Sequence, residues 1–327
     1  MKYIWRQINV GFGVEWARWT AVDIQNRQPK TDLSFDETNE VIQDESSIGV
    51  ITDSRDSFVS KRWAEWEISG NIETNSIWYL FYSLLWEVSS EVDTTWAYKH
   101  TFVLKETNQS PSLTIGVSDP VIWEKSFSLW MIESMTINAE EWEQAKFTID
   151  LKSKPSDSAS HTVVYNVDNK LLSRHSIFKV AENLAGLWTA NAICLKSFEI
   201  TINKNLEEDF CLWNISPVDF INKQFSIEWS FTALFTSTEF REYQLDGEHK
   251  AISFELKDTA NEIGVSSNPS LKISLPLVSF IEFDRTQWND EVVIQTLTFK
   301  WLYSNVDTSS IEVELINTVE EYEWESV

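Results

Sequence analysis

Apolar and polar residues alternate along most of the chain, as they do in strands that bury one face of an antiparallel sheet. Aromatic and β-branched residues take one set of positions, and Ser, Thr, Glu and Asn take the other. The clearest examples are residues 66–69, 147–151, 198–202 and 311–315. The pattern predicts a mainly β protein.

Two segments break the alternation. Residues 75–89 hold a mostly apolar run behind polar residues suited to a helix N-cap, which favours a helix; a buried strand is the competing interpretation. Residues 236–247 begin with the capping-box spacing of Thr236 and Glu239 and end at Gly247. We expect a second helix there.

Features of the first half recur in the second half in the same order. Glu65-Trp66 precedes the first predicted helix as Glu228-Trp229 precedes the second. Three further matches lie about 160 residues apart, namely residues 111–115 with 269–273, 135–137 with 297–299, and 147–151 with 311–315. A polar stretch at residues 153–160 separates the halves. The order predicts a tandem duplication; loose similarity between any two β-rich halves is the alternative.

Charge and cysteine content exclude several classes of function. The 327 residues include 26 Lys plus Arg against 51 Asp plus Glu, a formal net charge of −25. A surface with this much negative charge repels phosphate, which excludes a protein that binds nucleic acid tightly. The only cysteines are Cys194 and Cys211, so neither a disulfide framework nor a cysteine-based zinc site is expected. We expect both to be buried free thiols.

No catalytic, cofactor-binding or metal-binding motif is present in the sequence. The four histidines have no metal-site spacing, and no phosphate-binding glycine loop or nucleophile elbow occurs. With 51 acids, some pair always lies close, so a glycosidase pair cannot be singled out. Tryptophans with apolar neighbours are expected in core or interface packing, namely Trp66, Trp78, Trp86, Trp229 and Trp301. The sequence therefore predicts a protein that is not an enzyme.

The two ends and the longest apolar run give further expectations. The N-terminus lacks the apolar stretch of a signal peptide, so secretion by that route is not expected. The run at residues 77–86 is about half the length that crosses a bilayer, so no membrane anchor is expected. The acidic end of the chain, residues 319–327, is expected to be a solvated tail.

The order of these features resembles the major tail tube proteins of long-tailed bacteriophages, in their duplicated branch with two tube domains. The resemblance rests on residues 65–70 before the first apolar helix, His100-Thr101-Phe102, residues 111–115, residues 135–137 and the strand that follows. It implies two tandem β-sandwich or half-barrel domains, each with one flanking α-helix. The implied boundaries are 1–155 for the first domain with an N-terminal arm, 156–190 for a linker or extension, 191–318 for the second domain, and 319–327 for the tail.

What the resemblance implies for function is a structural virion protein with no cofactor. Three chains would form a ring with six tube domains, and the rings would stack into a tube that conducts DNA during ejection. Its partners would be other copies of itself and tail proteins such as the tail terminator, the tape measure and the distal tail protein, with assembly in the host cytoplasm and no contact with a membrane.

Strand alternation gives candidate lumen-facing residues. They occupy the polar positions of four predicted strands, namely Glu65, Glu67, Thr148, Asp150, Glu228, Glu312 and Glu314. A solvent-facing exterior position is the alternative for each of them. Residues 1–62 and 162–190 are expected to be arms that cross between rings.

Three other functions stay open at this point. A carbohydrate- or receptor-binding β protein would need exposed tryptophans along a groove. A glycoside hydrolase would need one indispensable acidic residue. The tube of a bacterial injection system shares the expected architecture.

Overall fold

The structure is a computed structural model that describes residues 4–24, 26–107, 109–121, 123–161, 168–286, 292–307, 310–320 and 322. Its elements fall into two successive units, which we call the first and the second unit. The first unit consists of η1 (Trp5–Gln7), β1 (Asn9–Val14), β2 (Asn26–Arg27), β3 (Asp32–Asp44), β4 (Asp56–Asn71), α1 (Trp78–Leu85), β5 (Trp86–Thr94), β6 (Ala97–Leu104), β7 (Leu113–Asp119), β8 (Trp123–Glu140), β9 (Lys146–Ser153) and β10 (Asp157–Ser158).

The second unit repeats this kind of succession. It consists of η2 (Ser173–His175), β11 (Ser176–Ala181), α2 (Leu184–Leu187), β12 (Leu195–Asn203), β13 (Leu206–Asp209), β14 (Asp219–Asn222), β15 (Ser226–Leu234), α3 (Glu239–Asp246), β16 (His249–Lys257), β17 (Ser270–Arg285), β18 (Ile294–Trp301) and β19 (Glu312–Asn317). The prediction of a mainly β protein is confirmed.

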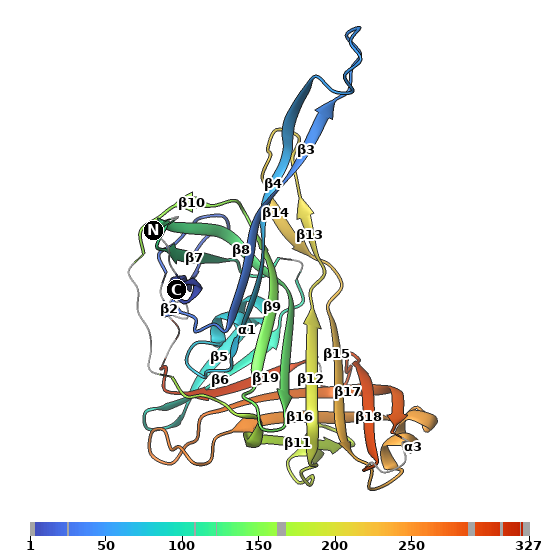
Figure 1. Ribbon diagram of the computed structural model, residues 1–327. Coiled ribbons are helices and arrows are strands. Elements are labelled where there is room, and N and C mark those ends of the chain that lie inside the picture. The colour runs from blue at the N-terminus through green and yellow to red at the C-terminus, as the bar shows by residue number, and fades with distance from the viewer. Residues whose placement is uncertain are drawn as a thin grey trace.

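One long antiparallel sheet runs through both units. Its strand order is β3, β4, β9, β8, β12, β15, β18 and the C-terminal half of β17, and the pairing of β8 with β12 joins the first unit to the second. Figure 1 shows these strands running vertically, with β4 and β9 toward the left and β18 toward the right. We call this the long sheet.

A second layer of strands crosses behind the long sheet. In the second unit it contains β11, β16, the N-terminal half of β17 and β19, and β19 pairs onward with β6 of the first unit. These strands run nearly horizontally in Figure 1. Aromatic side chains of the two layers meet between them: the Phe198 ring of β12 lies 3.6 Å from the Phe254 ring of β16, and Trp229 packs on Phe254 at 6.1 Å. The core is therefore enclosed by two crossing layers.

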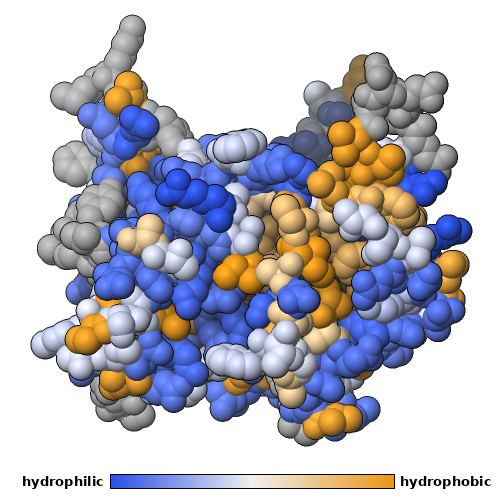
Figure 2. All heavy atoms as spheres, turned by 90° about the horizontal axis from the view of Figure 1, so that it is seen from below, coloured by the Kyte–Doolittle hydropathy of each residue, from blue (hydrophilic) through white to orange (hydrophobic). Residues whose placement is uncertain are grey.

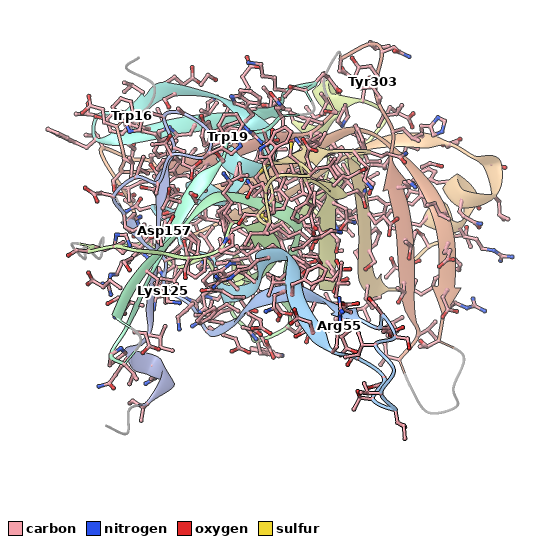
Figure 3. The ribbon with its side chains drawn as sticks, turned by 90° about the horizontal axis from the view of Figure 1, so that it is seen from above. Trp16, Trp19, Arg55, Lys125, Asp157 and Tyr303 are labelled. Atoms are coloured by element: carbon pink, nitrogen blue, oxygen red, sulfur yellow. The ribbon has the colours of Figure 1, made fainter. Side chains whose placement is uncertain are left out.

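Six antiparallel pairings occur once in each unit. They are β1–β7 and β11–β16, β3–β4 and β12–β15, β4–β9 and β15–β18, β8–β9 and β17–β18, β7–β8 and β16–β17, and β8–β10 and β17–β19. In the small β10 pairing Asp157 lies opposite Ser126 and Ser158 opposite Lys125, and Figure 3 shows Lys125 and Asp157 close together. The two units thus share one strand topology.

Two β-bulges fix which residues of the units correspond. In β8 the register with β9 shifts between Ile132 and Ser134, and in β17 the register with β18 shifts between Phe280 and Glu282. A second shift occurs in the pairing of β7 with β8 and, at the matching place, in that of β16 with β17. Because bulges bend a strand at defined residues, both shifts align β8 with β17 residue by residue.

The repeat in the structure corrects the strand matching made from sequence. Glu65-Trp66 does correspond to Glu228-Trp229, because β4 pairs with β3 and β9 as β15 pairs with their counterparts β12 and β18. The three later matches are displaced by one strand: the pairings equate β8 with β17 and β9 with β18, whereas the sequence matched β8 with β18 and β9 with β19. The hairpin of β5 and β6, which has no counterpart among the described residues of the second unit, causes the displacement.

The first predicted helix is shorter than expected. Every residue of α1 is buried, as its apolar composition requires, but the helix ends at Leu85. Trp86 has a positive φ of 79° and begins β5, so residues 86–89 are strand. The apolar run continues past the change of backbone direction at Trp86, and so the helix predicted from that run is too long.

The second predicted helix is confirmed, with one change at its start. α3 ends at Gly247, whose φ of 66° is the left-handed conformation that favours glycine. The N-cap is Thr238, whose side chain donates to Glu242 Oε1 at 2.8 Å and caps no backbone N–H. The expected capping box at Thr236 and Glu239 is therefore wrong.

Segments expected as arms, linker or tail contain sheet strands and core residues. β1 and β3 pair with β7 and β4, and β10 and β11, inside the expected linker at 156–190, pair with β8 and β16. Tyr322, in the expected solvated tail, is buried and its ring lies 3.9 Å from that of Trp78. Residues 162–167, 321 and 323–327 lie outside the described residues.

The burial of the cysteines and tryptophans differs in how well it agrees with the expectations from the sequence. Cys194 and Cys211 are free, but Cys194 is exposed and Cys211 half-buried, so their expected burial is wrong. Five tryptophans pack in or on the core as expected, namely Trp66, Trp78, Trp86, Trp229 and Trp301. No helix within the described ranges is long and apolar enough to cross a membrane.

Candidate functional surface

The face of the long sheet that points away from the core is polar from one edge to the other. One cross-strand row contains Ser69, Thr148, Thr136, Thr201, Glu228 and Lys300, each opposite the next. Thr136 and Thr201 share a hydrogen bond of 3.0 Å across the junction of the units, and Thr148 Oγ1 donates to Ser69 Oγ at 3.3 Å. We call this surface the polar face.

Five of the seven candidate residues lie together on the polar face. Glu65 and Glu67 of β4 are exposed, while Trp66 and Ile68 between them are buried. Thr148 and Asp150 project from β9 beside them, and Glu228 lies on β15 in the same row as Thr148. The alternation of buried and polar side chains used to choose these residues is therefore present on β4 and β9 of the first unit and on β15 of the second.

The other two candidates, Glu312 and Glu314, lie on β19 in the second layer. Their neighbours Val313 and Leu315 are buried in the core, so the two carboxylates point away from the long sheet. Glu314 pairs with Lys272 at 2.6 Å, and burial followed by the neighbouring Glu314 charge raises the pKa of Glu312. One surface cannot include all seven candidates, because the core separates these two from the rest.

Several acidic side chains of the polar face surround a shallow hollow of about 400 Å³. Five carboxylates line it against the single ammonium group of Lys152, namely Asp36, Glu65, Glu67, Glu133 and Asp150. Lys152 Nζ lies 3.0 Å from a Glu208 oxygen and 3.6 Å from a Glu133 oxygen. Burial disfavours its charge, but these carboxylates outweigh that effect and raise the pKa of Lys152. With five acidic side chains against one basic side chain, the lining of the hollow is predominantly acidic.

Sequence reasoning missed the part of the polar face contributed by β3. Ser34 lies opposite Glu67 and Asp36 opposite Glu65, so β3 extends the polar face by one more strand. The signal was present in residues 32–36, where Leu33 and Phe35 alternate with polar residues. Treating residues 1–62 as an arm concealed it.

A hairpin projects from one end of the long sheet. The distal parts of β3 and β4 extend beyond the body of the molecule, as Figure 1 shows, and Figure 3 places Arg55 there, well apart from Trp16 and Trp19. Arg55 Nε donates to Asp44 Oδ2 at 2.6 Å near its tip. Exposed apolar side chains lie along it, namely Val41, Ile42, Phe58 and Val59. Apolar side chains exposed in this number are typical of a contact surface.

The described residues offer no evident site for a metal. Within the described ranges, no three His, Cys, Asp or Glu side chains are grouped to hold an ion. What the geometry provides instead is an extended acidic face on a sheet with open edges.

These features together define a mainly β protein with an extended acidic face and open sheet edges in the part of the chain that the structure describes. The sequence model of the phage tail tube protein family matches residues 64–300, which is most of the chain and spans both units. The chain belongs to that family, and it is a structural component of a bacteriophage tail. No curated protein matches the chain. Family membership favours the tail tube over the carbohydrate-binding and glycosidase alternatives.

Proposed function

We propose that this chain is the major tail tube subunit and that its polar face lines the lumen through which phage DNA leaves. The observation that carries the proposal is the continuity of the polar face across both units, with the apolar core wholly behind it. A tube wall needs such a surface, because each subunit must present the same lining without a break.

The charge of the polar face suits the passage of DNA. Glu65, Glu67, Asp150 and Glu228 repel phosphate, so DNA meets no surface that retains it. Screening limits this repulsion to roughly 8–10 Å at physiological ionic strength, which is a distance at which a wall acts on a strand passing beside it. Glu312 and Glu314 then belong to the tube exterior, because they point away from the long sheet.

A ring of three chains follows from the two units. Each chain supplies two copies of the repeated strand topology, so three chains give six units around the lumen with pseudo-sixfold symmetry. The projecting hairpin of β3 and β4 is the segment we assign to contact with the adjacent ring. Assembly takes place in the host cytoplasm together with the tail terminator, the tape measure and the distal tail protein.

Microscopy and mass measurement test the proposal directly. Negative-stain images of the purified protein should show rings or hollow tubes, and mass photometry should give multiples of three chains of 38.0 kDa. Sixfold rings of identical subunits would contradict the trimer. A monomer that persists at every soluble concentration would contradict the tube.

The choice of lumen face has its own test. Glu67→Lys with Glu228→Lys should make assembled tubes retain short DNA fragments, because the lining then attracts phosphate. The matched control is Glu87→Lys with Glu91→Lys, which makes the same change of charge on β5 in the second layer. Equal retention by both pairs would place the lumen elsewhere.

A further inference from the structure

The long sheet has two open edges. β3 pairs with β4 alone, and residues Glu282 to Arg285 of β17 pair with β18 alone, in the part of the chain that the structure describes. An unpaired edge presents a row of backbone N–H and C=O groups that can bind another strand. Figure 1 shows that the strands next to these edges, β4 and β18, lie on opposite sides of the long sheet.

The two open edges have exact counterparts inside the chain. By the shared pairings and the shared bulge, Ser134 to Ile137 of β8 correspond to Glu282 to Arg285 of β17. By their equivalent partners β4 and β15, Phe35 of β3 corresponds to Ile200 of β12. The counterparts β8 and β12 pair with each other and join the units. The edge that β12 fills on the first unit is therefore empty on the second.

We propose that β3 of a second copy fills this edge, antiparallel to β17 and in the register of β8 with β12. The proposal rests on the ring of three chains described above and names the strands at its seam. Carrying the register across places Glu282 opposite Thr38 of the next copy, Phe283 opposite Glu37, Asp284 opposite Asp36, and Arg285 opposite Phe35.

The core side of the seam carries apolar surface that lacks a cover. Phe283, which packs on Phe235 at 6.4 Å, and Phe35, which stacks on Trp66 at 4.7 Å, are only half-buried. Their counterparts at the filled junction, Met135 and Ile200, are completely buried. On the same side as Phe283, Val293 is a further exposed apolar side chain, and its carbonyl accepts from the N–H of Phe235. Figure 2 shows that apolar side chains gather in one area when the molecule is seen from below.

The bulge adds a backbone group that fits the same strand. At the filled junction, the carbonyl of the bulged residue Glu133 accepts from Lys204 N–H at 2.9 Å. The corresponding bulged residue is Ile281, and the residue that corresponds to Lys204 is Asn39. The Ile281 carbonyl accepts a long contact of 3.5 Å from Gln244 Nε2. A carbonyl has two lone pairs, so the N–H of Asn39 from the next copy can bind there.

On the polar side of the seam, the largest difference from the filled junction is one pair of like charges. Where Thr136 and Thr201 share a hydrogen bond of 3.0 Å, the seam brings Asp284 opposite Asp36. Like charges directly opposite each other weaken a strand pair. We therefore expect the strand pair at the seam to be weaker than the β8–β12 pair.

Cysteine cross-linking tests the register. In a background of Cys194→Ser and Cys211→Ser, Asp36→Cys with Asp284→Cys should give disulfide-linked dimers and trimers under mild oxidation, because opposite Cα atoms in a strand pair lie within disulfide reach. The control is Glu40→Cys with Asp284→Cys, four residues or roughly 13 Å out of register. We expect at least tenfold less cross-linking from the control. Circular dichroism checks that both variants are folded.

The outcomes separate the seam from the tube. Rings in the microscope with no cross-link, or with equal cross-linking from the two pairs, would overturn the seam and leave the tube standing. No oligomer of the wild-type chain at any soluble concentration would overturn both.

A second variant tests the same pair without cysteines. Asp284→Thr should lower the concentration needed for ring formation severalfold, because it removes the opposed charges. Glu228→Thr removes one carboxylate from the polar face away from the seam and should change that concentration little. An equal effect of the two substitutions would mean that general charge, and not the seam pair, controls association.

Discussion

The junction of β8 with β12 and the open edges of β17 and β3 occupy equivalent places in the two units, but their side chains differ. At the junction, Ile137 and Ile200 face each other in the core, and Thr136 and Thr201 face each other on the polar side. The open edges carry Arg285 and Phe35 at the first position and Asp284 and Asp36 at the second. The same backbone arrangement thus carries apolar and hydroxyl pairs where it forms a contact within the chain, and charges and half-buried rings where its edge is open.

The largest effect should come from removing a core side chain at the junction. Ile200→Ala should lower the free energy of unfolding of the isolated subunit by about 2–5 kcal/mol, because it leaves a cavity at a fully buried site. The equivalent Phe35→Ala should cost about half as much, since Phe35 is already partly exposed. Urea unfolding of the two variants measures both. Equal losses would mean that the junction and the open edge are packed alike.

The next effect concerns a buried amine that only the junction contains. Lys204 donates to Ser83 O and to Ser110 Oγ at 2.6 Å each, and burial, followed by the nearby Arg18 charge, lowers its pKa from 10.5 to about 7. Asn39 takes the corresponding place on β3. Between pH 7 and 10.5 the unfolded chain holds a proton on this lysine that the folded chain has lost, so stability rises with pH.

Lys204→Met removes that rise. The wild-type subunit should gain about 2 kcal/mol relative to the variant between pH 7.5 and 9, as measured by urea unfolding at each pH. The difference between the two proteins isolates Lys204 from other groups that titrate in this range. Parallel pH profiles would show that the Lys204 amine keeps its proton when the chain folds.

A smaller effect should follow when the charges of the open edge are copied into the junction. Thr136→Asp with Thr201→Asp should destabilise the subunit by about 1 kcal/mol, because two carboxylates then face each other. Added salt should reduce that loss, since the positions are partly exposed. The single variant Thr136→Asp is the control. A double variant no worse than the sum of its singles would show that the opposed charges do not interact.

The smallest effect on stability belongs to the hairpin tip, which lies outside both regions. Replacing residues 45–54 by a two-residue turn should change the free energy of unfolding by less than about 0.5 kcal/mol, since the segment is almost entirely exposed. The same deletion should leave rings intact and stop them from stacking into tubes. Normal tubes from the shortened chain would exclude the hairpin from ring contact.

Local patterns in the sequence predicted a large part of the fold. Period-2 alternation placed Trp66, Ile149, Trp229 and Val313 in the core, where the structure has them, and Gly247 marked the end of α3. These predictions succeeded because burial and backbone conformation at such positions depend on neighbouring residues. The end of α1 at Trp86 did not follow, because an apolar run is compatible with both helix and strand.

The sequence predicted which side chains of each candidate strand point away from the core, but not which sheet each strand joins. Alternation tells which residues of a strand share a face, so Glu65, Glu67, Thr148, Asp150 and Glu228 were placed correctly away from the core. It does not tell which sheet a strand joins, and so Glu312 and Glu314 were grouped with residues from which the core separates them. Pairing between distant strands determines that grouping, and the hairpin of β5 and β6 concealed it in the sequence.

Joining two units in one chain has a consequence for how fast a ring can close. The β8–β12 junction forms within one chain, so three of the six contacts in the proposed ring of three chains would arise without any encounter between molecules. Only the remaining three depend on concentration, and the tether between the units holds its contact at a high effective concentration. In the proposed ring, the fused chain would turn an assembly of six bodies into one of three, and the contact between chains could change in strength while the contact within the chain stays closed.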